Sequence, residues 1–247
     1  MVEVFVLGAP RTGTSVLFSV LNQVVRLPGL GEGHVMPLYA RLLREHAAYV
    51  ASAPAETLAH ALDAAAFRKV VMEHLRAFYA RTLFPGAWVD KTPGAEAIAA
   101  AALARETFPN ARFVLTVRNG IEAVASIQRK FATSHEHACH IWADPYRAAE
   151  RLHEDVGEYL QIDQFEIANE PARTAERLCA FLDIADYAAE IGAGFAAPRA
   201  DQLSSHDPSR RMTLAEAGWT AEETWMFRHI CSGQMRRLGY GALLDAG

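Results

Sequence analysis

The sequence predicts an α/β protein: a parallel β-sheet with helices on both faces, in a single domain of residues 1–247. Short apolar runs rich in β-branched residues alternate along the chain with stretches of helical periodicity. Strands that alternate with helices form parallel sheets whose two faces those helices cover. A chain of 247 residues, of which 51% are hydrophobic, can also bury the core that such a domain requires.

The first half of the chain contains one predicted strand and several helices. Residues 2–7 form a continuous apolar run, which predicts a buried strand, and residues 14–25 have the periodicity of a following helix. From residue 38 to residue 84 the pattern is helical and rich in alanine, which predicts a helical insertion. Its apolar residues share one face at i, i+3 and i+4 spacing and belong to the core: Phe67, Val70, Val71, Leu75 and Phe78.

The second half repeats the alternation. Strands are predicted at residues 87–91 (AWVDK), 112–118 (RFVLTVR) and 159–167 (YLQIDQFEI), and helices at residues 96–108, 121–131 and 172–184. Residues 198–213 (PRADQLSSHDPSRRMT) are rich in turn-forming residues, which predicts a long loop and a candidate lid. Arg210 and Arg211 are interpreted either as part of that lid or as ordinary surface charges.

Composition excludes several classes of partner. The net charge of −5 and the isoelectric point near 6.1 give no general attraction to nucleic acid or to an anionic membrane. Cys139, Cys179 and Cys231 are odd in number and far apart, which suits a reducing compartment. No apolar run reaches about 18 residues, and a first strand at residue 2 leaves no room for a signal peptide. We therefore expect a cytoplasmic protein without stable membrane insertion.

The segment GAPRTGTS (residues 8–15) between the first strand and its helix resembles a phosphate-binding loop. In the nucleotide-binding signature G-x-x-x-x-G-K-[ST], Gly8, Gly13 and Ser15 are in register, while Thr14 occupies the lysine position. Backbone N–H groups at a helix start can cradle an anion. The alternative is an ordinary strand-to-helix turn, but the glycine spacing favours a phosphate loop and a P-loop NTPase-like fold.

Charged residues stand at the carboxyl ends of the next two predicted strands. Asp90 and Lys91 end the second strand, and Arg118 ends the third. Ligands of parallel α/β sheets bind at this edge. Each charge alone would be read as a solvated surface group, but together they favour one site beside the phosphate loop.

Two of these segments carry a resemblance to a known family. GAPRTGTSVL (residues 8–17) resembles the 5′-phosphosulfate loop of the sulfotransferases that use 3′-phosphoadenosine 5′-phosphosulfate (PAPS). VRNGIEAVAS (residues 117–126) is similar to their 3′-phosphate motif, in which an arginine is followed eight positions later by a serine. DKTP (90–93), FEIANEPARTAERLCAFLDI (165–184) and RRLGYG (236–241) also resemble segments of the bacterial and tyrosylprotein-type branches.

The resemblance implies a set of cofactor-binding residues. Arg11 would be the cation of the loop, and its neighbours would offer N–H and hydroxyl donors to the 5′-phosphate: Pro10, Thr12, Gly13, Thr14 and Ser15. Arg118 and Ser126 would hold the 3′-phosphate, with Lys130 one helical turn further on. In a kinase the loop lysine binds the β- and γ-phosphates of a nucleotide whose charge also requires Mg²⁺. The phosphosulfate carries less charge, so no metal is expected.

The resemblance also implies a metal-independent sulfuryl transfer from PAPS to an acceptor hydroxyl or amine, with adenosine 3′,5′-bisphosphate as product. Arg11 and Lys91 would be its cations. An ungapped comparison from Arg11 places Glu32 at the base position of the tyrosylprotein-type branch, and His34 is the second candidate. The cytosolic branch has a histidine where this chain has Pro93. The chain between residues 25 and 32 can span up to about 23 Å, enough to return along a helix of about 18 Å.

Other interpretations remain beside this one. Asp90 after an apolar run is also expected of a P-loop small-molecule kinase or nucleotide hydrolase that binds Mg²⁺. A non-catalytic nucleotide-binding regulator with the same fold is a third class. The acceptor is left open among sugar, peptide, lipid and small phenol.

Three further motifs carry less weight. HEHACH (135–140) lacks the HExxH spacing and a second ligand pair, so zinc is not favoured over a segment bordering the acceptor pocket. GLGEG (29–33) follows no clear strand and is rejected as a dinucleotide fingerprint. Gln164 stands where the family often has a tyrosine.

Overall fold

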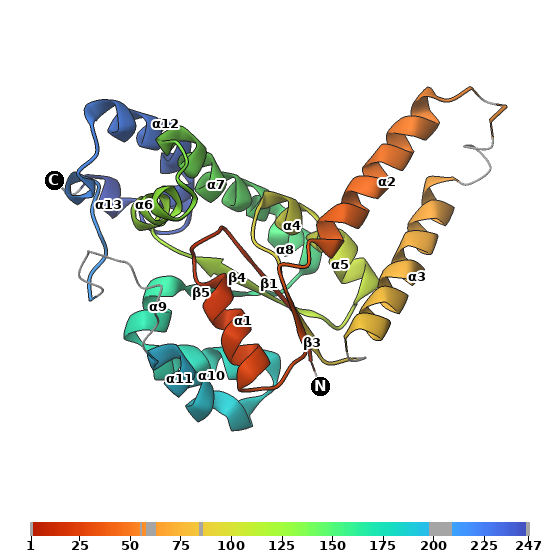
Figure 1. Cartoon of the computed structure of the whole chain (residues 1–247), viewed down its shortest axis with the longest axis horizontal. Coiled ribbons are helices and arrows are strands. Elements are labelled where there is room, and N and C mark those ends of the chain that lie inside the picture. The colour runs from red at the N-terminus through yellow and green to blue at the C-terminus, as the bar shows by residue number, and fades with distance from the viewer. Residues whose placement is uncertain (1, 55, 58–62, 84–85, 198–208, 246–247) are drawn as a thin grey trace.

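The fold is a five-stranded parallel sheet, seen in a computed structural model that describes residues 2–54, 56–57, 63–83, 86–197 and 209–245 (Figure 1). The strand order is β2-β3-β1-β4-β5, and every neighbouring pair is parallel. The strands are β1 (Glu3–Gly8), β2 (Gly29–Gly31), β3 (Trp88–Lys91), β4 (Arg112–Val117) and β5 (Leu160–Asp163). The predicted α/β fold with a parallel sheet is confirmed.

Helices cover both faces of this sheet. Successive buried side chains of β1 point to opposite faces, so each face is apolar and packs against helices. Val4 and Val6 pack against α1 (Thr14–Gln23), α9 (Gln164–Asn169), α10 (Pro171–Leu182) and α11 (Ala188–Ala196). Phe5 and Leu7 face the larger apolar cluster. Its helices are α2 (Val35–Ser52), α3 (Ala64–Thr82), α4 (Ala95–Ala99), α5 (Ala101–Thr107), α6 (Gly120–Phe131), α7 (His135–Ala148), α8 (Leu152–Val156), α12 (Ala221–Arg237) and α13 (Ala242–Asp245). Short 3₁₀ helices lie at Ala149–Arg151, Ala185–Tyr187 and Ala215–Ala217.

The predicted helical insertion contains a helical hairpin. Figure 1 shows α2 and α3 side by side, projecting from the sheet and its other helices. Stacked rings join them, Tyr39 on His74 and His46 on Phe67. At the base of the hairpin, Leu75 and Tyr79 of α3 are buried against the body.

A predicted strand and a predicted helix differ in extent from the elements in the structure. The strand expected over residues 159–167 ends at Asp163, because this residue caps a helix: its carboxylate accepts from Phe165 N, and Glu166 returns to its backbone N–H. The single helix expected over residues 96–108 is divided at Ala100 into α4 and α5. Both differences are local and leave the strand order unchanged.

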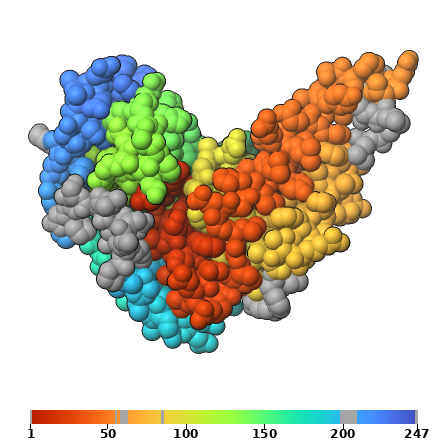
Figure 2. All heavy atoms as spheres, in the orientation of Figure 1, coloured from red at the N-terminus to blue at the C-terminus, as the bar shows by residue number. Residues whose placement is uncertain are grey.

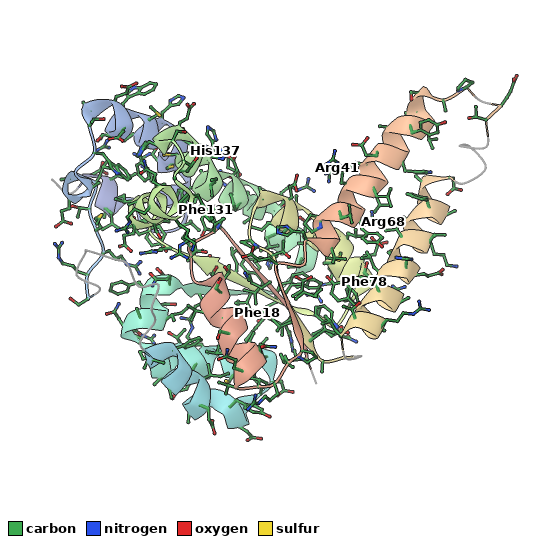
Figure 3. The ribbon with its side chains drawn as sticks, viewed as in Figure 1. Phe18, Arg41, Arg68, Phe78, Phe131 and His137 are labelled. Carbon is green, nitrogen blue, oxygen red and sulfur yellow. The ribbon has the colours of Figure 1, made fainter. Side chains whose placement is uncertain are left out.

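The segment GLGEG (29–33) contains the short strand β2, which the sequence did not indicate. Gly29, Leu30 and Gly31 pair with β3 at the edge of the sheet. Phe18 projects from α1 (Figure 3) and closes over this strand. A Cβ on Gly29 would lie 2.6 Å from Phe18 Cε2 and 2.8 Å from Val89 Cγ1, so the close packing requires glycine.

Replacing Gly8 by alanine should destabilise the fold. A Cβ there would lie 2.3 Å from Thr116 Oγ1 and 2.7 Å from the Thr116 carbonyl oxygen, at a φ of +148°. We expect the free energy of unfolding to fall by about 1–3 kcal/mol, as for other overpacked sites. Urea unfolding measures it. Gly233→Ala, where a Cβ meets nothing within 4 Å, is the control and should not destabilise; equal stability of both variants would contradict the packing argument.

Within the described residues, no helix is both long and apolar enough to span a membrane.

Candidate functional site

The predicted site residues gather at the carboxyl ends of three adjacent strands. Val6 of β1 pairs with Lys91, and Gly8 pairs with Thr116 of β4. The turn after β3 is tied to the same place, since Gly94 N donates to Gly8 O at 2.9 Å. Figure 2 shows a hollow between the α2–α3 hairpin and the lobe of α6 and α7, with the N-terminal segment at its floor.

The loop of residues 8–15 is held from within by a threonine. The Thr12 hydroxyl donates to Ala9 O at 2.7 Å and lies 2.8 Å from Thr116 Oγ1. These contacts hold the loop in its conformation and tie it to β4. Arg11 has a positive φ of 68°, and α1 begins at Thr14. The first N–H groups of a helix lack partners within that helix. Ser15 is exposed, and Pro10 and Gly13 are half-buried. This part of the loop, at the start of α1, is therefore accessible from solvent.

Three residues predicted to bind the cofactor are in direct contact. Arg11 Nε donates to Ser126 Oγ of α6 at 3.1 Å. Arg118 Nη1 donates to the carbonyl oxygen of Arg11 at 3.2 Å. Lys130 is exposed one turn beyond Ser126 on α6. Two guanidinium groups and a hydroxyl therefore meet beside the start of α1, an arrangement suited to a phosphate.

A carboxylate that sequence reasoning missed orients Arg118. Arg118 Nε lies 3.2 Å from Glu122 Oε2, and the two side chains are only 15% and 13% exposed. Glu122 Oε1 also accepts from Asn119 Nδ2 at 3.1 Å and from Met212 N at 3.0 Å. Burial lowers the pKa of Arg118, and the Glu122 charge opposes that change. The signal in the sequence was the i, i+4 spacing of opposite charges.

Lys91 and Glu32 form an ion pair across the turn after β2. Lys91 Nζ lies 2.7 Å from Glu32 Oε1; the lysine side chain is 4% exposed and the glutamate side chain 54%. Glu32 has a φ of 106° and His34 a φ of 50°. The structure thus brings the predicted base and a predicted cation together, and places the alternative base His34 at the start of α2.

Asp90 points away from this ion pair, into the interior. Successive side chains of a strand face opposite sides of the sheet. Asp90 is 1% exposed, and its two oxygens accept hydrogen bonds from the Tyr79 and Thr92 hydroxyls. Burial raises its pKa above the usual range. These contacts do not favour the Mg²⁺ role, because a magnesium ligand must face the phosphates.

The described part of the chain contains no group of three or more His, Cys, Asp or Glu side chains placed to hold a metal ion. HEHACH begins helix α7, in which His135 and Cys139 are buried. Trp142 of the same helix donates to the Arg118 carbonyl oxygen at 3.1 Å and supports the end of β4.

The candidate lid is described only from residue 209 onward; residues 198–208 lie outside the described residues. Arg211 lies 2.7 Å from Asp163 Oδ2, and its guanidinium lies over the Phe165 ring, 4.4 Å from the centroid. Arg210 lies beside Glu216 at 2.5 Å. Gln164 is the first residue of α9, next to the Asp163 that Arg211 contacts.

Comparisons with known proteins agree on one family. A family model described as "Sulfotransferase family" matches residues 3–188. The fold is similar to the sulfotransferase domain from the curacin biosynthetic pathway, with 18% identity, 74% of each chain covered and a TM-score of 0.50.

Two further solved structures are similar. The sulfotransferase domain of the Synechococcus PCC 7002 olefin synthase is 20% identical over 84% of this chain and 81% of that chain, with a TM-score of 0.55. Sulfotransferase STF9 from Mycobacterium avium is 15% identical over 95% and 76%, with a TM-score of 0.54. At these identities the likeness concerns the fold. No curated protein matches the chain significantly.

Proposed function

This chain belongs to the sulfotransferase family, and we propose that it moves a sulfuryl group from PAPS to an acceptor hydroxyl or amine without a metal ion. The observation that supports the proposal is the assembly of Arg11, Arg118 and Ser126 beside the start of α1. Residues 115 positions apart in the sequence meet there, and their donors are those that a phosphate requires.

The proposed cofactor site has two ends. Arg118 and Ser126 would hold the 3′-phosphate, with Lys130 at its outer side. Glu122 and the Arg11 carbonyl oxygen engage Nε and Nη1 of Arg118 and so orient its guanidinium. The N–H groups of residues 13–15 would bind the 5′-phosphate at the start of α1. Arg11 would lie between these two ends and contact both.

The chemistry would divide between Glu32 and Lys91. The acceptor oxygen forms a bond to sulfur, and the bond from sulfur to the bridging phosphate oxygen breaks. Glu32 would take the acceptor proton, and Lys91 and Arg11 would stabilise the charge on the leaving phosphate oxygen. The ion pair of Lys91 and Glu32 would open as Lys91 turns to the phosphosulfate, which frees the carboxylate to act as a base.

The direct test is an acceptor screen. The protein is incubated with PAPS and with sugars, peptides, lipids and small phenols in the presence of EDTA, and mass spectrometry detects added SO₃. We expect at least one acceptor to be sulfated. Phosphorylation of an acceptor with ATP and Mg²⁺, with no SO₃ transfer, would contradict the proposal.

Arg118→Ala should remove most of the preference for a 3′-phosphate. We expect the wild-type protein to bind adenosine 3′,5′-bisphosphate far more tightly than ADP, with no effect of EDTA. Losing a charged hydrogen-bonded partner typically costs about 1.5–3 kcal/mol, roughly 10- to 150-fold in affinity. Calorimetry with both nucleotides measures it.

Arg112→Ala, at the opposite end of β4, is the matched control and should bind as the wild-type protein does. Equal affinity of the wild-type protein for the two nucleotides, or a requirement for Mg²⁺, would refute the assignment of this site.

A further inference from the structure

The turn that carries Glu32 has an unusual backbone. Glu32 and His34, neither of which is glycine, have positive φ values of 106° and 50°. Such residues cost free energy and persist only where the surrounding structure holds them. The turn joins the three-residue strand β2 to α2, so its own secondary structure supplies little restraint.

One contact holds this turn to the sheet at its second strained residue. His34 N donates to Thr92 Oγ1 at 3.3 Å. Thr92 is 5% exposed and directly follows Lys91 on the chain. The other contact is the ion pair between Lys91 and Glu32. Lys91, the last residue of β3, and Thr92, the residue after it, thus hold the turn at two points, one on each side of Gly33.

The Thr92 hydroxyl is itself oriented by the buried carboxylate of Asp90. It donates its hydrogen to Asp90 Oδ1 at 3.0 Å, which leaves its lone pairs to accept from His34 N. The other oxygen of Asp90 accepts from the Tyr79 hydroxyl of α3. Asp90 and Tyr79 are each 1% exposed, so the hydrogen bond between them is shielded from water.

We propose that Thr92, oriented by Asp90, is a positioning residue that holds the strained turn so that Glu32 stays opposite Lys91. The role in transfer rests on the proposed function. Thr92 touches neither reactant; it acts through the backbone of His34. In this proposal the buried carboxylate of Asp90 acts by orienting the Thr92 hydroxyl and not by contacting a reactant.

The experiment compares Thr92→Val, which removes the hydroxyl at similar shape, with Thr92→Ser, which keeps it. Hydrogen exchange by mass spectrometry follows peptides covering residues 29–38. Thr92→Val should speed exchange in the turn by about 10-fold, as loss of one hydrogen bond allows. Thr92→Ser should exchange as the wild-type protein does. Thr92→Ala, with thermal unfolding of every variant, guards against a packing defect peculiar to valine.

Transfer from PAPS to the acceptor found in the screen is measured on the same variants. Thr92→Val and Thr92→Ala should lower kcat by about 10-fold, with unchanged affinity for adenosine 3′,5′-bisphosphate, and Thr92→Ser should restore it. Unchanged exchange in Thr92→Val, faster exchange with unchanged kcat, or equal losses in the valine and serine variants would overturn the proposal.

Failure of the proposed function would be recognised separately. The wild-type protein would then sulfate no acceptor and show no preference for the 3′-phosphate. That result overturns the role of Thr92 in transfer, while the exchange data still decide whether it anchors the turn.

Discussion

Glu32→Gln is expected to reduce sulfuryl transfer by about 10²- to 10⁴-fold, the usual effect of losing a general base. Glutamine keeps the shape of the side chain and a hydrogen-bond acceptor for Lys91, but it cannot take a proton from the acceptor. Affinity for adenosine 3′,5′-bisphosphate should stay nearly unchanged, because Arg118 and Ser126 lie on the opposite side of β1. Single-turnover transfer and calorimetry measure the two quantities.

Two further variants are compared with Glu32→Gln. Glu45→Gln changes an exposed glutamate of α2 and should transfer normally. His34→Ala tests the neighbouring candidate for the base. Normal transfer by Glu32→Gln with inactive His34→Ala would mean that the turn is right and the residue wrong. If both variants are active, the proton leaves by another route and the proposed mechanism fails.

Lys91→Ala should lower kcat by about 10²-fold or more, because it removes a cation from a site shielded from water. The lysine side chain is 4% exposed, so its charge acts where water screens it little. Lys69→Ala, an exposed lysine of α3, is the matched control. Binding of adenosine 3′,5′-bisphosphate and thermal unfolding show whether the loss belongs to the chemical step or to the fold.

Asp90→Asn separates this mechanism from a magnesium-dependent one. Asp90 serves the Tyr79 and Thr92 hydroxyls, so its replacement should cost less in kcat than the loss of Lys91. A metal-dependent enzyme predicts the reverse order. Near-normal turnover in Lys91→Ala together with an inactive Asp90→Asn would favour the nucleotide hydrolase or kinase.

The sequence by itself determined the α/β fold and the edge of the sheet to which the candidate site is assigned. Buried parallel strands are continuous apolar runs, and the phosphate loop is a contiguous segment between a strand and a helix, so both signals are local. The charges that end β3 and β4 could be placed near each other, since parallel strands finish at the same edge. Residues 8–15, Lys91 and Arg118 were assigned to the candidate site in this way.

Only the tertiary structure decided which of these charges face one another. The contact between Arg11 and Ser126 joins residues 115 apart, and β2 exists because Phe18 and β3 enclose a glycine strand with no propensity of its own. Neighbours along β3 face opposite sides of the sheet, and packing settled that Lys91 meets Glu32 while Asp90 turns to Tyr79. Such pairings depend on side chains from distant segments that only the folded chain brings together, and local patterns in the sequence carry no record of them.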